Sequence, residues 1–235
     1  MSVNPTHINT QSGNILIYIL GAIVLIGLLT IMVKGSSTPG SGIDREALEI
    51  RVAEVQAYGN ELERAVSYVL RNGYSETDIR FAHPNHSSAY GDITDDPARQ
   101  IFAREGGGAT WRDNESDIQT QDEDWLFNGR NRVIGIGTTE ASISSSELVS
   151  VLPYVTKDFC LLVNDKNNIT NTSNNPPQDD NNVLFTPIFS GTFTFAASIG
   201  DAPTDYLHQK NEGCFEGETN PPAGTYHYYR VLLAR

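Results

Sequence analysis

The sequence predicts an α+β fold: an N-terminal transmembrane helix, then a long amphipathic helix, then a globular domain with an antiparallel sheet. Three observations support this prediction: an uncharged apolar run near the N-terminus, a helical repeat of apolar residues after it, and β-rich segments towards the C-terminus. A long helix followed by late strands, without a helix between each pair of strands, is typical of such proteins. The expected organisation is a polar leader or N-terminal tail at 1–13, a transmembrane helix at 14–34, a flexible linker at 35–42, and an extracytoplasmic domain at 43–235.

The apolar run is the first of these elements. Ile15 to Val33 reads ILIYILGAIVLIGLLTIMV and contains no charged residue. A helix rising about 1.5 Å per residue would nearly match the roughly 30 Å hydrocarbon core of a bilayer. The alternatives are a buried core helix and a cleaved secretory signal. A secretory signal begins with a positively charged segment, whereas the residues before this run contain no Lys or Arg. We therefore predict a single-pass membrane protein, with the membrane as one partner.

The second element is an amphipathic helix over residues 43–72. The Gly-, Ser- and Pro-rich residues 34–42 before it disfavour a helix, and Asn72-Gly73 provides a stop signal. The helix can pack on the protein's own domain or on a neighbouring copy, and both alternatives stay open. Its apolar residues recur at alternating spacings of four and three, which places them on one face; they are Leu48, Val52, Val55, Gly59, Leu62, Val66 and Val69.

The remaining elements follow from shorter patterns. Residues 131–138 alternate as in a strand, and 144–164 have helical spacing with Pro153 expected to kink or divide the helix. Two late segments, 183–199 and 224–233, are rich in aromatic and β-branched residues and predict strands.

Composition excludes one class of function. The chain of 235 residues has 29 acidic and 16 basic residues, for a net charge of −13. A nucleic-acid-binding protein needs a basic surface to neutralise phosphates. We therefore expect no nucleic-acid partner.

The cysteines indicate the compartment. The chain has two, Cys160 and Cys214, both in the predicted extracytoplasmic domain. An isolated even pair in an exported domain is typical of a disulfide, and the alternative is two unpaired buried thiols. The pair favours a domain at the cell surface or in the periplasm.

The sequence lacks the motifs of the common hydrolases. None of its histidines forms a His-Glu-x-x-His pair, and there is no Gly-x-Ser-x-Gly elbow. The triple glycine at 106–108 is not followed by Lys-Ser/Thr, so it predicts a tight turn rather than a phosphate loop. We expect that the protein is not an enzyme.

One acidic segment has the spacing of a calcium loop. Oxygen ligands at alternate positions suit a hard cation, although Ile118 stands where such loops turn on Gly. We expect no resident cofactor, with Ca²⁺ as the one candidate and a solvated acidic loop as the alternative. The candidate ligands occupy the first, third, fifth, seventh and twelfth positions; they are Asp113, Glu115, Asp117, Gln119 and Asp124.

The layout of the chain resembles that of a known family. A short polar leader ending at Gly13, an apolar helix, an amphipathic helix and a β-rich domain with a late cysteine resemble the type IV pilins and the pseudopilins of secretion systems. The resemblance implies cleavage between Gly13 and Asn14, helices bundled in a filament core, and globular heads outside. Tyr18 stands at the fifth position after Gly13, where that family usually has Glu.

The resemblance and the two helices lead to an expected function. We expect a structural subunit of an extracellular filament or envelope assembly, anchored by its N-terminal helix and self-associating as a homo-oligomer or filament. The alternative is a monomeric membrane-tethered binding or adhesion module. The residues expected to insert, self-associate or dock the globular domain are Ile15, Ile19, Gly21, Ala22, Ile26, Gly27, Leu48, Val52, Val55 and Leu62.

Overall fold

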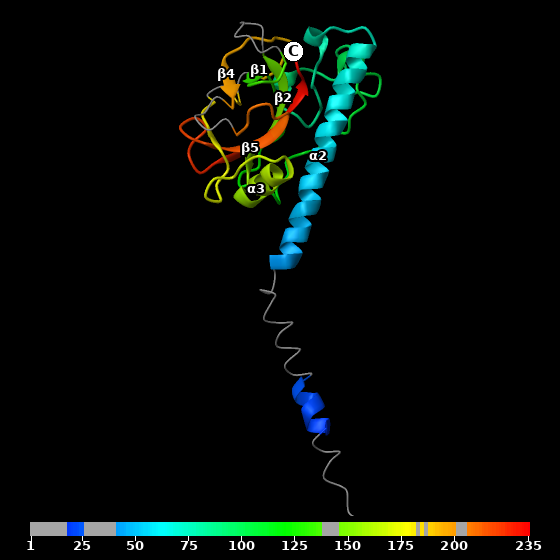
Figure 1. Cartoon of the computed structure of the whole chain (residues 1–235). Coiled ribbons are helices and arrows are strands. Elements are labelled where there is room, and N and C mark those ends of the chain that lie inside the picture. Colours follow the sequence, from blue (N-terminus) through cyan, green and yellow to red (C-terminus); the bar gives the residue numbers. More distant parts are fainter. Residues whose placement is uncertain (1–17, 26–40, 138–145, 182–183, 186–187, 201–205) are drawn as a thin grey trace, which may run out of the picture. The chain divides into compact units, whose positions relative to one another are not determined.

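The computed structural model describes residues 18–25, 41–137, 146–181, 184–185, 188–200 and 206–235. The chain divides into two compact units, residues 1–48 and residues 49–235. In the first unit, residues 18–25 form a helical stretch. The second unit contains the sheet, shown with the helices in Figure 1.

Helix α2 (Ser41–Arg71) confirms the predicted amphipathic helix. It ends where Gly73 adopts a φ of +94°, a conformation that glycine takes without steric cost. The predicted stripe is buried in the domain, because Val52, Val55 and Leu62 have no exposed surface, and neither have Val66 and Val69. The intramolecular alternative for this face of the helix is therefore the one observed.

The sheet has six strands in the order β3-β5-β6-β2-β1-β4. The central pairs β5–β6, β6–β2 and β2–β1 are antiparallel, whereas the outer pairs β3–β5 and β1–β4 are parallel. The strands are β1 (Leu126–Val133), β2 (Glu147–Val155), β3 (Gln178–Asp179), β4 (Ala197–Ile199), β5 (Glu212–Gly217) and β6 (Tyr226–Leu233).

The predicted fold class is wrong in two respects. The sheet is mixed rather than antiparallel, because each of its two edge strands, β3 and β4, runs parallel to the strand beside it. In addition, the described residues include no helix that is both long and apolar enough to cross a membrane, so the predicted transmembrane helix at 14–34 is not supported. Of that segment, only residues 18–25 are described.

Strand β2 replaces the first half of the helix predicted at 144–164. It is the centre of the sheet and is buried along almost its whole length, so it carries apolar residues on both faces and lacks the alternation of a half-exposed strand. Pro153 interrupts its pairing with β6, and Tyr154 follows at a φ of +54°. The helix begins only afterwards, as α3 (Lys157–Lys166), capped by the Thr156 side chain.

The late segments are partly as predicted. Strand β6 confirms the strand predicted at 224–233, whereas β4 is the only strand that the structure describes within 183–199. Strand β5 was not predicted, because Glu212–Gly217 contains two glycines and two glutamates and resembles a turn more than a strand.

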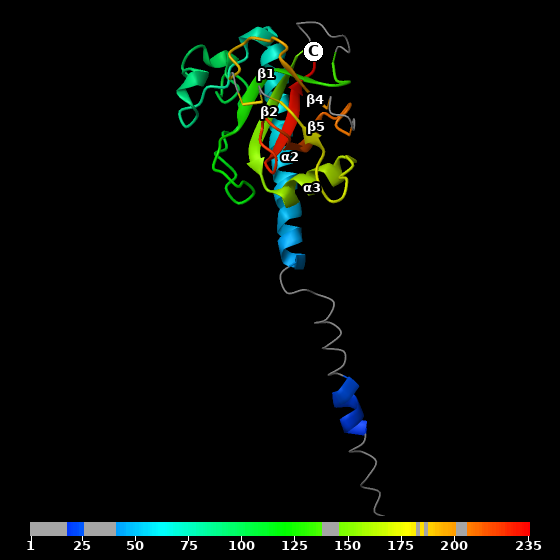
Figure 2. The ribbon, with the colours of Figure 1, turned by 90° about the vertical axis from the view of Figure 1, so that its left-hand side faces the viewer.

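The two faces of the sheet have different coverings. Residues 49–71 of α2 run along one face, where α3 also packs, and Figure 2 shows α2 beside the central strands. Tyr228 and Cys214, which are opposite one another on β6 and β5, point to this face. The opposite face holds a separate apolar cluster that includes Val149, Val151, Phe215, Tyr229 and Val231 from the strands and Ile169, Leu184 and Leu207 from the connecting segments.

Three 3-10 turns connect α2 to the sheet: η1 (Glu76–Asp78), η2 (Ser88–Tyr90) and η3 (Pro97–Arg99). The triple glycine follows them as a turn, as predicted, with Gly108 at a φ of +66°. A Cβ at Gly107 would lie 2.8 Å from the Cβ of Ala65, so this glycine allows the turn to lie directly on α2.

Candidate functional site

The inner face of α2 is fastened to the sheet by a cluster around Arg230 on β6. Its guanidinium contacts Glu212 at 2.6 Å and Glu63 at 2.8 Å, and also donates to Asn60 Oδ1 at 2.6 Å. A Cβ at position 59 would lie 2.3 Å from Arg230 Cδ, so Gly59 makes room for the arginine. Gly59 is thus part of the docking surface rather than an interruption of the apolar stripe.

The outer face of α2 is exposed among the residues that the structure describes. Ile50 is 60% exposed and Tyr68 is 47% exposed, and Ala53 and Ala57 are exposed between them. A hollow of about 500 Å³ opens between this side and the Arg230 cluster, lined by Ala57, Asn60, Glu63, Arg64 and Ser67.

The helical stretch in the first unit is apolar and exposed. Its six large hydrophobic side chains have exposed fractions between 53% and 72%; they are Tyr18, Ile19, Leu20, Ile23, Val24 and Leu25. Gly21 has no atom within 4 Å of the position of an added Cβ, and Ala22 is exposed as well. A helix that is apolar on every side is normally covered by other protein or by lipid.

The acidic segment forms ion pairs instead of an open ligand cage. Arg51 on α2 contacts Asp117 at 2.6 Å and Glu115 at 2.5 Å, and it also pairs with Glu54 one turn along the helix. The hydrogen bonds to these carboxylates raise the pKa of Arg51, so the guanidinium remains charged. The segment is therefore fastened to α2 by a cation that the protein itself provides.

The other predicted calcium ligands point elsewhere. Asp113 accepts a hydrogen bond from the Trp111 indole at 2.8 Å, and Gln119 binds the backbone of Glu115 and Pro153. Asp124 lines a different hollow, beside His86. Within the described part of the chain, no group of three or more His, Cys, Asp or Glu side chains could hold a metal ion. The geometry gives the calcium prediction no support.

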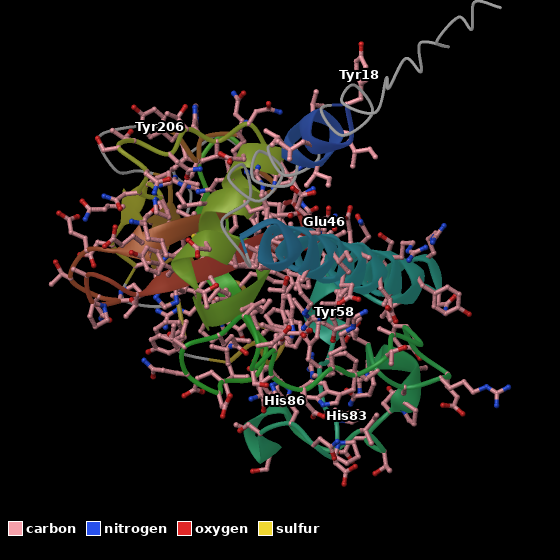
Figure 3. All side chains as sticks on the ribbon, turned by 90° about the horizontal axis from the view of Figure 1, so that it is seen from below. Tyr18, Glu46, Tyr58, His83, His86 and Tyr206 are labelled. Atoms are coloured by element: carbon pink, nitrogen blue, oxygen red, sulfur yellow. A yellow bond between two sulfur atoms is a disulfide. The ribbon has the colours of Figure 1, made fainter. Side chains whose placement is uncertain are left out.

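Two histidines lie in an aromatic cluster formed mainly by the segment that connects α2 to β1. Figure 3 shows His83 and His86 close together. The His83 ring stacks on Trp111 with 4.8 Å between centroids, and the His86 ring stacks on Tyr90 at 3.9 Å. Burial lowers the pKa of both imidazoles. The Nε2 and Nδ1 atoms of His86 lie 3.0 Å and 3.3 Å from the carbonyl oxygens of Trp125 and Phe81, so this imidazole is a packed core group.

His227 and Thr225 lie within hydrogen-bonding distance, but their arrangement is not that of a catalytic pair. The Tyr154 N–H donates to His227 Nδ1, so the proton of the neutral ring is on Nε2 and is donated to Thr225 Oγ1 at 2.8 Å. The Thr225 hydroxyl in turn donates to the Pro222 carbonyl. The imidazole therefore cannot act as a base towards this hydroxyl, and burial lowers its pKa to about 3.

Glu147 is a wholly buried carboxyl group at the start of β2. Its Oε2 accepts a hydrogen bond from the Val133 N–H at 2.8 Å, whereas the structure gives Oε1 no hydrogen-bond partner among the described residues. Burial raises its pKa to about 7, against the opposing effects of Arg132 and Arg235. Its charge, and with it the stability of the sheet, should change near neutral pH.

Cys160 on α3 and Cys214 on β5 form the predicted disulfide, with 5.3 Å between their Cα atoms. Both cysteines are fully buried, and Asn164 reinforces the junction by binding the backbone N–H and C=O of Cys214 at 2.9 Å. A buried disulfide of this kind is typical of proteins that fold in an oxidising, extracytoplasmic compartment.

The predicted assembly residues and the predicted processing site at Gly13 and Asn14 fall into three groups. Val52, Val55 and Leu62 are buried in the domain, and Leu48 is half-buried. Ile19, Gly21 and Ala22 lie in the exposed helical stretch. The rest lie outside the described residues; they are Gly13, Asn14, Ile15, Ile26 and Gly27.

Three charged residues that matter to the argument were not predicted: Glu147 and Arg230, which contact other parts of the fold, and Arg130, which lines a hollow. Each lies on a strand, where a charge normally indicates a solvent-facing position. Only Arg230 had a signal in the sequence, namely the glycine at position 59 in an otherwise apolar helix face.

Comparison of the chain with models of protein families, with curated proteins and with solved structures found no match.

Proposed function

We propose that this protein is a structural subunit of an extracytoplasmic filament or envelope assembly, of pilin-like plan. The observation that supports the proposal best is the exposed apolar stretch at residues 18–25. Large apolar side chains on every side of a helix have a strong tendency to associate, since burial is worth about 25 cal/mol per Å² of apolar surface.

Small residues within the stretch support association between helices. Gly21 and Ala22 present little side-chain bulk, and the space beside Gly21 is open. Helices approach one another closely where such residues lie at their interface. In the proposed assembly, the apolar stretches of several copies pack together, and Ile19, Leu20 and Ile23 become buried between them.

Helix α2 would join this bundle to the globular domain. Its inner face is already occupied by the sheet through Val55, Leu62 and the Arg230 cluster, whereas Ile50 and Tyr68 on its outer face are exposed. The inner side of this helix can therefore pack on its own domain while the outer side packs on neighbouring copies. In agreement with the family resemblance, we also propose that the leader is removed between Gly13 and Asn14.

Two measurements on cells expressing the full chain test this proposal. Mass spectrometry of the mature N-terminus should find Asn14 as the first residue, and electron microscopy of sheared surface material should show filaments. Finding intact Met1 together with only monomeric protein would refute the pilin-like proposal.

A pair of variants separates assembly from folding. Leu20→Glu places a charge in the apolar stretch and should abolish assembly without changing the melting temperature of the domain. Thr120→Glu adds the same charge at an exposed loop position and should assemble like the wild type. Equal assembly of both variants would contradict a role for residues 18–25.

A second candidate function is a monomeric extracytoplasmic binding module. It is favoured by a hollow of about 310 Å³ that is lined by Arg130 on β1. Under this alternative the protein stays monomeric, and replacing Val52, Val55 or Leu62 destabilises the domain without any effect on assembly. Sedimentation velocity of the full chain distinguishes the two functions.

A further inference from the structure

We propose that the hollow at Arg130 binds a small molecule through an oxyanion, a carboxylate or a phosphate group. This proposal does not depend on the assembly function. The hollow has a volume of about 310 Å³ and is lined by Gly129, Arg130, Ile188, Phe189, Ser190, Thr192 and Thr194. Its size is at the lower end of the range of ligand pockets, which suits a compact ligand such as a sugar acid or a sugar phosphate.

The charge of the lining is unusual for this protein. The chain carries a net charge of −13, yet the hollow contains an arginine and no carboxylate. Among the described residues, the Arg130 guanidinium makes no ion pair or side-chain hydrogen bond, and its Nε is buried without a partner. A guanidinium in this state keeps its terminal Nη donors available for a carboxylate or phosphate.

The remaining lining residues complement an anion. Ser190, Thr192 and Thr194 provide three hydroxyl groups that can donate hydrogen bonds, and Phe189 and Ile188 provide apolar surface. Polar groups that fix the orientation of a ligand beside apolar side chains are the usual composition of a small-molecule site.

The backbone around the hollow holds its shape. The segment 189–196 runs beside β1, with the Phe189, Thr194 and Ala196 N–H groups donating to carbonyls of β1. A Cβ at Gly129 would lie 2.6 Å from the Phe189 ring, so only glycine lets this ring pack against the strand. The site is thus formed by a strand and a segment hydrogen-bonded to it.

Other arginines make the surroundings favourable to an anion. Arg132 lies over the Phe195 ring at 4.8 Å and Arg235 lies over the Phe193 ring at 4.0 Å. Arg80 packs against Gly191 and donates to the Thr77 and Ile79 carbonyls. Three carboxylates lie near these cations: Glu76 pairs with Arg235, Glu147 interacts with Arg132 and Arg235, and Asp78 interacts with Arg80. These cations should raise the local concentration of anions around residues 189–196.

The test uses the full-length protein and four probes: inorganic phosphate, acetate, glucose 6-phosphate and glucuronate, with glucose as the uncharged control. Isothermal titration calorimetry should show saturable binding of the anions and none of glucose. Comparing the phosphate pair with the carboxylate pair determines which oxyanion the site prefers.

Matched variants locate the binding. Arg130→Gln should weaken the affinity for the preferred anion about tenfold or more, the loss expected for a charge-assisted pair. Arg104→Gln removes one positive charge from an exposed loop position and should change the affinity less than twofold. Thr194→Val, which keeps the shape of the side chain, should weaken binding to an intermediate degree. Melting temperatures close to that of the wild type establish that each variant is folded.

A chemical measurement gives an independent readout. Phenylglyoxal modifies accessible arginines, and peptide mass spectrometry quantifies each site separately. The anion should protect Arg130 and leave the modification of Arg104 unchanged. Equal protection of both arginines, unchanged affinity in Arg130→Gln, or the absence of saturable anion binding would overturn the proposal.

Discussion

Arg230 and Arg130 both lie on strands of one sheet but have opposite surroundings. Arg230 on β6 is held by Glu63, Glu212 and Asn60 on the face covered by α2. Arg130 on β1 lines an open hollow without a carboxylate. The first arginine connects a helix to the sheet, whereas the second has no structural partner among the described residues. The difference suggests that the first stabilises the fold and the second is available for a ligand.

The largest difference in stability should be found between two single variants, each of which replaces one of these arginines by methionine. Arg230→Met leaves Glu212 buried without its cationic partner, although Gln56 still donates to it, and should reduce the free energy of unfolding by about 3–5 kcal/mol. Arg130→Met removes no partner and should change it by less than about 0.5 kcal/mol. Urea denaturation of both variants gives the comparison. Equal losses would show that Arg130 also has a structural role.

The same contrast applies to apolar residues on the two faces of α2. Leu62→Ala creates a cavity under the helix and should cost about 2–5 kcal/mol of unfolding free energy. Ile50→Ala, at a position that is 60% exposed, should stay within about 0.5 kcal/mol. A large loss in Ile50→Ala, measured on monomeric protein, would mean that the outer face of α2 is covered.

The pH dependence of stability should also differ between buried carboxyl groups. Glu147, which has no cation in hydrogen-bonding contact among the described residues, should destabilise the fold as pH rises, the opposite of a carboxylate that is paired with an arginine. Because burial raises the pKa of Glu147 to about 7, the folded protein holds a proton that the unfolded chain releases at lower pH. Its contribution is therefore fully present below the unfolded pKa and is lost as pH rises through about 7, by up to roughly 3 kcal/mol. Glu147→Gln should remove this loss.

His227 acts in the opposite direction over part of the same range. Burial lowers its pKa to about 3, so its contribution is present above its ordinary pKa and is lost as pH falls towards 3. Between about pH 4.5 and 6.5 the two effects oppose each other. The unfolding free energy of Glu147→Gln should therefore rise with pH in that window, and a flat profile in this variant would contradict the assignment.

The smallest effect should come from the ion pairs of Arg51. Asp117 and Glu54 are about half exposed, and the buried Glu115 keeps Arg112 at 3.9 Å, so Arg51→Gln should cost about 1–2 kcal/mol, and less at high salt. Arg51→Gln also bears on the calcium prediction, because it leaves the carboxylates of Glu115 and Asp117 without their guanidinium. For the wild-type protein, a melting temperature that rises when calcium chloride is added would support the calcium prediction.

The sequence predicted the elements that have one buried face or a clear strand composition. The stripe on α2 has a regular period because one side of the helix contacts the core, whereas β6, which is buried on both faces, was predicted from its aromatic and β-branched residues. Strand β2 was misread because both of its faces are buried, and Leu148, Leu152 and Val155 happen to have helical spacing. The parallel edge strands β3 and β4 have two and three residues, too few for any periodic pattern.

The sites were harder to predict than the fold. The disulfide could be predicted because Cys160 and Cys214 are the only two cysteines. The acidic loop resembled a cation site because a sequence shows ligand spacing but not that Arg51, more than sixty positions away, occupies the carboxylates. The Arg130 hollow is formed by segments that meet only in the folded chain, and an unpaired arginine looks the same in a sequence as a paired one.

The proposed assembly depends on whether the exposed apolar stretch associates between copies. Sedimentation velocity of full-length protein, with Leu20→Glu and Thr120→Glu measured beside it, tests this most directly. We predict large species for the wild type and Thr120→Glu, and a monomer near the chain mass of 25.8 kDa for Leu20→Glu. A wild type that sediments as a monomer at every concentration would contradict the proposed function.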